Sequence, residues 1–201
     1  LVGVAPSAAQ AALYRPRYNV APTDEHWILG ARERRRELGR ARWGFVGQKH
    51  RATINARAES AERLALFGPA FLHTRCVVPV DGFFEWTGAG TARQPVWFHA
   101  PGGAWLPVAG LYRREANGHE AFTIVTTTAN QDVRAVHDRM PVVLATGDID
   151  RWLAEPARDL LAPCPDGILI ATPVSHRVSS VRHDDPACLA PPGGEPQGSL
   201  F

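Results

Sequence analysis

The feature that most constrains the fold is a series of short runs rich in β-branched and aromatic residues, separated by Gly, Pro, Asp and Asn. The runs cover residues 27–29, 76–80, 96–99, 107–111 and 122–127. Apolar runs of this length between turn-forming residues are typical of β-strands. We therefore predict that the body of the protein is a mostly antiparallel sheet.

Helical patterns are fewer than strand patterns. Residues 58–72 carry apolar side chains at intervals of three and four, and residues 148–157 begin near Thr146 and Asp148, either of which can cap a helix. A weaker helical pattern covers residues 130–136. Together with the strands, these helices predict an α+β fold. We expect one domain over residues 1–190 and a flexible tail, rich in Pro and Gly, over residues 191–201.

The composition limits where the protein works and what it binds. Of the 201 residues, 45% are hydrophobic, which is enough for one domain to bury a core. No apolar run is long enough to span a membrane, and the first ten residues lack a secretory signal, so we predict a soluble, cytoplasmic protein with no membrane partner. The net charge of +2 argues against bulk coating of nucleic acid, so an anionic partner must meet a local patch.

The three cysteines do not form a recognisable pattern. Their number is odd and they are widely spaced, at Cys76, Cys164 and Cys188. This arrangement predicts neither a disulfide framework nor a cysteine-ligated metal site. We therefore expect reduced thiols, and the sequence implies no metal and no organic cofactor.

Four segments place polar side chains at the edge of apolar runs. They are RYNVAPT at residues 17–23, INARAE at 54–59, DGFFEW at 81–86 and HDRMP at 137–141. Each alone is ordinary, because Asn and Asp are common in turns and a Glu between two aromatic residues can face solvent on an alternating strand. Their order and spacing together carry more information than any one of them.

Taken together, these segments resemble the SOS-response-associated peptidase (SRAP) family. The resemblance rests on RYNVAPT, WGF, INARAES, RCVVPVDGFFEW, TTTAN, HDRMPVVL and PVSHRVSSVRHDDPACL, which extend over nearly the whole chain. It implies a distorted, barrel-like core of mostly antiparallel strands with a few flanking helices. It also implies a protein, expected to be a monomer, that recognises abasic sites in single-stranded DNA.

The reaction that the resemblance implies uses an N-terminal cysteine, exposed when the initiator methionine is removed. An abasic deoxyribose opens to an aldehyde, and an α-amine with a pKa of about 7.7–8.0 is neutral often enough near physiological pH to attack it. The resulting Schiff base and the neighbouring thiol then close a thiazolidine ring, which crosslinks protein to DNA.

The resemblance assigns the remaining catalytic roles to three residues. Glu85 matches the family's acid–base carboxylate, His137 its catalytic histidine, and Asn55 the asparagine that hydrogen-bonds the amine or the ring formed from it. Neighbouring aromatic residues predict that desolvation raises the pKa of Glu85. The alternatives are a solvent-facing Glu85, a His137 that caps a turn and an Asn55 that stabilises its own loop.

Two arginines match positions that hold the phosphates beside the lesion. They are Arg57 and Arg139, and a guanidinium can bind phosphate oxygens with two parallel hydrogen bonds. As an alternative, either arginine pairs with Glu59 or Asp138.

The sequence departs from the family pattern in two places. It opens at Leu1 without the cysteine, so we expect either that a Met-Cys-Gly-Arg start precedes Leu1, which we favour, or that this member only binds DNA. The loop after Gly44 reads FVGQKHRAT, where the family carries a proline and one or two tryptophans. With one aromatic residue and several charges, this loop predicts weaker, more salt-dependent DNA binding.

Two other functions remain open at the level of sequence. One is a non-catalytic module that binds single-stranded DNA, which the absent nucleophile suggests. The other is a hydrolase that uses Cys76 or Cys164 with His137. Against it, Cys76 lies in the apolar run RCVVPV, where a buried structural thiol is more common than a nucleophile.

Overall fold

The computed structural model describes residues 4–32, 35–46, 52–90 and 93–193. The strands are β1 Glu25–Arg32, β2 Arg35–Trp43, β3 Phe45–Val46, β4 Ala52–Thr53, β5 Asn55–Arg57, β6 Arg75–Val80, β7 Gly82–Thr87, β8 Gln94–His99, β9 Leu106–Arg114, β10 Glu120–Thr128, β11 Arg139–Pro141 and β12 Ile170–Pro173. The α-helices are α1 Ala8–Leu13, α2 Gly68–His73, α3 Gln131–Arg134 and α4 Ile149–Ala154. Short 3-10 turns include η1 Ala61–Arg63, η6 His176–Ser179 and η7 Pro186–Leu189.

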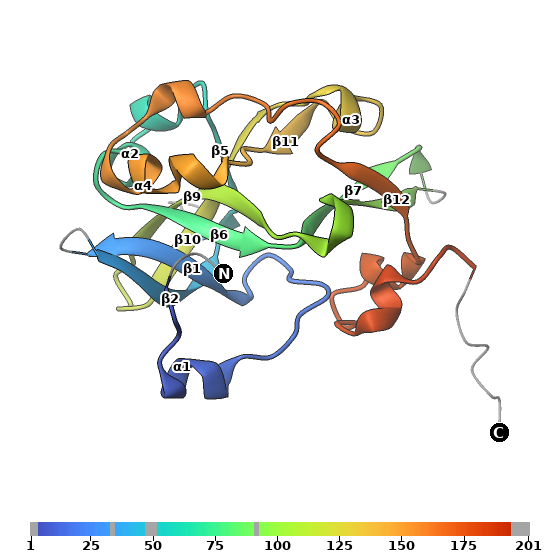
Figure 1. Ribbon diagram of the computed structural model, residues 1–201, viewed down its shortest axis with the longest axis horizontal. Coiled ribbons are helices and arrows are strands. Elements are labelled where there is room, and N and C mark those ends of the chain that lie inside the picture. Colours follow the sequence, from blue (N-terminus) through green and yellow to red (C-terminus); the bar gives the residue numbers. More distant parts are fainter. Residues whose placement is uncertain (1–3, 33–34, 47–51, 91–92, 194–201) are drawn as a thin grey trace.

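The main sheet closes into a ring (Figure 1). Its strand order is β11-β10-β2-β1-β6-β9, and β9 pairs again with β10. Most pairs are antiparallel, but β10 runs parallel to both β2 and β5. The predicted α+β class with a mostly antiparallel sheet is confirmed, and each of the five predicted strands lies within an observed one.

Strand β6 is buried on both faces, which explains its unbroken apolar sequence. Val77 belongs to a cluster with Phe71 of α2 and Trp152 of α4, so these helices cover one face of the ring. Val78 belongs to a second cluster with Phe98 of β8, on the side of the smaller sheet. The core therefore holds the helices, the ring and the smaller sheet together.

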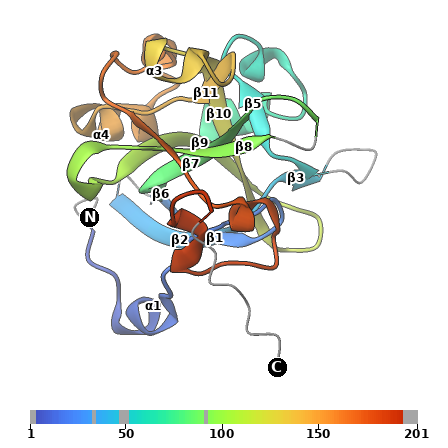
Figure 2. The same cartoon turned by 90° about the vertical axis from the view of Figure 1, so that its right-hand side faces the viewer.

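The smaller sheet has the strand order β12-β8-β7. Alternation along β7 divides its side chains between two environments. Phe83 stacks on Phe98 with ring centroids 5.4 Å apart, whereas Phe84 and Trp86 pack with Val178 and its neighbours in the C-terminal segment. Figures 1 and 2 place this segment at the end of the molecule that carries the smaller sheet.

The predicted helix over residues 58–72 is wrong as a single element. The chain forms η1, then a turn, and only then α2. Gly68 and Pro69 open α2, and a Cβ on Gly68 would lie 2.6 Å from the Glu62 carbonyl oxygen. Since proline is favoured in the first turn of a helix and disfavoured inside one, α2 begins here rather than continuing η1.

The other two predicted helices exist but are shorter than expected. Asn130 caps α3 by accepting a hydrogen bond from the Val133 N–H at 3.2 Å, and α3 ends at Arg134. Helix α4 follows Asp148 and ends at Ala154, because Pro156 disfavours helical conformation at the residue before it.

Parts of three predictions fall outside the described residues: residues 47–51 of the basic loop, residues 194–201 of the tail and residues 1–3 of the single domain. None of the described helices is long and apolar enough to cross a membrane.

Candidate active site

Three of the five predicted site residues share one face of the main sheet. In the ladder, Asn55 pairs with Ile124, Arg57 with Thr126, and Arg139 with Thr128. Paired residues on neighbouring strands point to the same face, and so do residues two apart on one strand. Asn55, Arg57 and Arg139 therefore flank β10 on one side of the sheet.

The opposite face of the same strands is buried. Ala56 and Val125 are 0% exposed and Met140 is 1% exposed. This alternation fixes the register, because a shift by one residue would turn the apolar set outward and the polar set into the core. The segment INAR thus forms a strand whose two polar side chains, Asn55 and Arg57, project away from the core.

Glu85 reaches the site from the smaller sheet. It lies on β7 between Phe84 and Trp86, and its side chain is 25% exposed. Burial raises the pKa of its carboxyl, as predicted from its aromatic neighbours, and Asp138 acts in the same direction. His137 and Arg93 attract the charged form and offset part of this rise in the pKa.

His137 lies in the turn between α3 and β11 and faces Glu85. Its Nδ1 atom is 4.0 Å from Glu85 Oε1 and 3.4 Å from Asp138 Oδ1. The backbone nitrogen and carbonyl oxygen of Arg139 lie 3.0 and 3.1 Å from Nδ1, so Nδ1 has a backbone partner in either tautomer of the ring. Glu85 and His137 are 52 residues apart in sequence, and the fold brings them within reach of proton exchange through a ligand or a water.

The two predicted phosphate-binding arginines differ in their environment. Arg57 is exposed, and within the described part of the chain its guanidinium makes no hydrogen bond or salt bridge. The Arg139 guanidinium is occupied: it donates to both carboxylate oxygens of Glu59 and to the Thr126 carbonyl. The alternative of a pair between Arg139 and Glu59 is therefore present in this structure.

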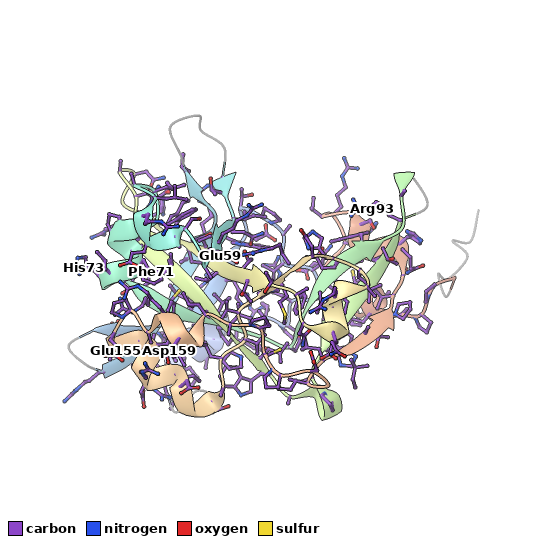
Figure 3. The ribbon with its side chains drawn as sticks, turned by 90° about the horizontal axis from the view of Figure 1, so that it is seen from above. Glu59, Phe71, His73, Arg93, Glu155 and Asp159 are labelled. Atoms are coloured by element: carbon purple, nitrogen blue, oxygen red, sulfur yellow. The ribbon has the colours of Figure 1, made fainter. Side chains whose placement is uncertain are left out.

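Asn55 is exposed, and its amide makes no hydrogen bond with any other described residue. Its donor and acceptor are thus available to a ligand rather than used to hold a turn. Figure 3 views the molecule from above, with Glu59 labelled near the centre and Arg93, the residue before β8, labelled toward the smaller sheet.

The cysteines do not contribute a nucleophile to this face. Cys76 is fully buried, and burial raises the pKa of its thiol. Burial also raises the pKa of Cys164 to about 11, with nearby Asp132 adding to the effect. Both thiols are therefore protonated near neutral pH, and the thiolate is the reactive form.

An open pocket of about 550 Å³ adjoins the site beside Asp138. Thr128, Arg134 and Cys164 also line it. Within the described ranges, no group of three or more His, Cys, Asp or Glu side chains is arranged to hold a metal ion.

Sequence reasoning missed the role of the RYN segment, although the resemblance includes it. Asp184 accepts hydrogen bonds from the N–H groups of Tyr18 and Asn19 at 2.6 and 2.8 Å, and it also pairs with Arg17. These contacts join residues 17–19 to residue 184 and do not include Glu85. The sequence signal for this contact is that Asn19 and Asp184 each lie in a segment that resembles the family. A single sequence does not show that two residues 165 positions apart are hydrogen-bonded.

Comparison with known proteins relates the whole domain to one group. The abasic site processing protein YoaM of Bacillus subtilis is 30% identical over 197 residues, which cover 88% of this chain and 85% of that protein. The abasic site processing protein HMCES of Gallus gallus is 32% identical over 227 residues, with 89% of this chain and 67% of that protein covered.

Solved structures give the same picture at the level of fold. A crystal structure of a protein from Bacteroides thetaiotaomicron matches with a TM-score of 0.77 at 23% identity, over 91% of this chain and 88% of that one. The family model described as SOS response associated peptidase (SRAP) matches residues 3–181. The chain therefore belongs to the SOS response associated peptidase family.

Proposed function

We propose that the protein captures abasic sites in single-stranded DNA as a covalent thiazolidine crosslink. The nucleophile is an N-terminal cysteine encoded upstream of Leu1 and exposed when the protein hydrolyses the peptide bond after its initiator methionine. The observation that carries the proposal is the 4.0 Å approach of Glu85, whose pKa burial raises, to His137. The relatives named abasic site processing proteins support the choice of DNA lesion.

The proposed chemistry balances without an oxidant or a cofactor. The cysteine amine adds to the aldehyde carbon of the opened sugar, and the carbinolamine loses one water to give an imine. The thiolate then adds to the imine carbon while the nitrogen takes a proton, which closes the ring. Each step moves a proton, and general acid–base groups accelerate such transfers by about 10²–10⁴-fold.

Glu85 and His137 suit these proton transfers. With its pKa raised, Glu85 is protonated over a wider pH range than an exposed carboxyl, so it can donate to the leaving hydroxyl and accept again afterwards. The imidazole of His137 can both accept and donate a proton, and its Nδ1 atom lies 4.0 Å from Glu85 Oε1. Asn55 offers one donor and one acceptor to the amine.

Arg57 is the proposed phosphate contact on this face. It is exposed, and binding a DNA phosphate would break no salt bridge between Arg57 and the described residues. A phosphate beside the lesion would place the sugar over Asn55, two residues away on the same strand and face.

The properties of the internal thiols count against a cysteine hydrolase. Cys76 and Cys164 are buried, and burial raises the pKa of both. Replacing each with alanine should leave crosslinking intact, whereas loss of activity would place the nucleophile there.

The test uses the full chain translated from its gene and an oligonucleotide with one abasic site. We expect a shifted band that survives heating in a denaturing gel, and an intact mass equal to protein plus DNA minus one water. A complex that dissociates on heating would instead identify a non-covalent binding module. The intact mass of the protein alone shows whether its mature first residue is cysteine.

A further inference from the structure

Glu59 and Arg139 form an ion pair with two hydrogen bonds on the face of the site. Arg139 Nη1 lies 2.6 Å from Glu59 Oε1, and Arg139 Nη2 lies 2.9 Å from Glu59 Oε2. This is the parallel two-bond geometry of a guanidinium and a carboxylate. Hydrogen bonding from Arg139 lowers the pKa of the Glu59 carboxyl, so the carboxylate is charged at neutral pH.

The same guanidinium also donates a hydrogen bond to the backbone of the neighbouring strand, β10. Arg139 Nη2 donates to the Thr126 carbonyl at 2.7 Å. Its side chain therefore connects three elements: β11, on which it lies, β10, and the turn after β5 that carries Glu59. Strand β11 has only three residues, so this side chain adds an anchor that its short ladder does not supply.

The backbone of Arg139 supports the histidine of the site. Its N–H lies 3.0 Å from His137 Nδ1, and its carbonyl oxygen lies 3.1 Å from the same atom. When Nδ1 is unprotonated it accepts from the N–H, and when it is protonated it donates to the carbonyl. One residue thus satisfies Nδ1 in both protonation states that a proton-transferring histidine visits.

We propose that Glu59 is a positioning residue, which holds the Arg139 side chain so that the Arg139 backbone keeps the His137 ring in one orientation. The role of His137 in catalysis rests on the proposed function above. Glu59 itself touches neither Glu85 nor His137 in any of the described contacts.

This assignment separates Arg139 from Arg57. The Arg139 side chain is 19% exposed, and both of its terminal nitrogens are occupied by protein acceptors. A DNA phosphate would have to displace Glu59 to bind it with two hydrogen bonds. Arg57 needs no such exchange, so it is the better phosphate contact of the two.

The first test compares Glu59→Ala with Glu62→Ala. Glu62 is a matched control, because it lies three residues away and also accepts two hydrogen bonds from an arginine, the Nε and Nη2 atoms of Arg158. None of the described contacts joins that pair to His137. We expect Glu59→Ala to slow crosslinking about 10-fold, the usual loss when a residue that orients a reacting group is removed. The Glu62→Ala rate should equal wild type, and neither change should alter affinity for undamaged single-stranded DNA.

A double mutant tests whether Glu59 acts through Arg139. If it does, adding Glu59→Ala to Arg139→Ala should slow crosslinking no further. A multiplied loss in the double mutant would overturn the proposal. So would a Glu59→Ala protein that binds undamaged DNA more tightly, with a steeper salt dependence and a normal crosslinking rate, since Glu59 would then merely restrain a phosphate-binding arginine.

Nitrogen NMR of the His137 ring gives a readout independent of DNA. We expect the ring nitrogen chemical shifts of His137 to change in Glu59→Ala and to keep their wild-type values in Glu62→Ala. A slower rate with unchanged ring shifts would overturn the proposal, because Glu59 would then act elsewhere. If the wild type forms no crosslink at all, the proposed function fails, whereas the ring shifts still decide the role of Glu59.

Discussion

Among single residues, Glu85 shows most clearly how position determines chemistry. Its neighbours on β7 are aromatic, and its carboxyl is three-quarters buried, at 25% exposure. Burial destabilises the charged form more than His137 and Arg93 stabilise it, so the net effect raises its pKa. Ionisation of a carboxyl that is buried in this way lowers the free energy of unfolding. Side chains with such perturbed pKa values are common in active sites.

Replacing Glu85 with glutamine should therefore stabilise the protein while it impairs crosslinking. A carboxyl with a raised folded pKa favours the fold below its ordinary pKa, and this contribution is lost as pH rises toward the folded value. The gain in stability from Glu85→Gln should vanish below the ordinary carboxyl range and grow as the pH rises above it. Because about 1 kcal/mol shifts Tm by about 2–4 °C in a domain of this size, thermal unfolding at several pH values will detect it.

The control for this prediction is Glu25→Gln, which removes an exposed carboxylate that pairs with Arg40. Exposed pairs contribute about 0–1 kcal/mol, so little change in Tm is expected, with normal crosslinking. If Glu85→Gln crosslinks at the wild-type rate, Glu85 is not the acid–base group.

The sequence indicates candidate site residues but not the contacts that they make. The resemblance named Glu85, His137 and Asn55, and the aromatic neighbours of Glu85 correctly predicted the direction of its pKa shift. It left the partner of Arg139 open between phosphate, Glu59 and Asp138. That choice depends on the turn after β5 meeting β11, 80 residues later, which is a property of the tertiary structure.

Among elements, buried strands were predictable and exposed or irregular ones were not. Apolar runs marked β6, β9 and β10, because these strands are buried along most of their length. Strand β2 was missed, since its sequence RRELGRARW is rich in charge and mostly outside the core. Helix α1 was also missed, although Ser7 and Gln10 form a capping box that its sequence spacing indicates.

Strand β7 depends on a glycine that the DGFFEW segment contains at its second position. A Cβ on Gly82 would lie 2.1 Å from Trp97 Nε1 and 2.6 Å from the Phe98 carbonyl oxygen. Either the indole or the strand must move, so we expect Gly82→Ala to destabilise the protein by about 1–3 kcal/mol, measured by urea unfolding. Since β7 carries Glu85, crosslinking should slow as well.

Gly147→Ala is the matched control for Gly82, because a Cβ there meets nothing within 4 Å. Its stability should stay within about 0.5 kcal/mol of wild type, as for most surface changes. Equal effects of the two substitutions would show that the contact with Trp97 does not constrain β7.

Across the whole molecule, the C-terminal segment is anchored to the RYN segment near the start of the domain. The Asn19 amide donates to the carbonyls of Val178 and His183, both at 3.0 Å, and to that of Ser180 at 3.2 Å. In the opposite direction, the Asp184 carboxylate accepts hydrogen bonds from the backbone N–H groups of residues 18 and 19. The segment beyond β12 in turn packs on Phe84 and Trp86, so it supports the outer face of the strand that carries Glu85.

Asp184→Asn should weaken this anchor in a pH-dependent way. Burial alone would raise the pKa of Asp184, but the N–H groups of Tyr18 and Asn19 and the Arg17 guanidinium outweigh it, and the pKa is lowered. A carboxyl with a lowered folded pKa stabilises the fold above its ordinary pKa, and the contribution is lost as pH falls toward the folded value. We expect the variant to lose about 1–3 kcal/mol at pH 7 in urea unfolding, and the deficit to shrink as the pH is lowered below the ordinary carboxyl range. A deficit that stays constant from neutral to acidic pH would contradict this prediction. The negative charge of Asp184 would then not contribute to the stability of the anchor.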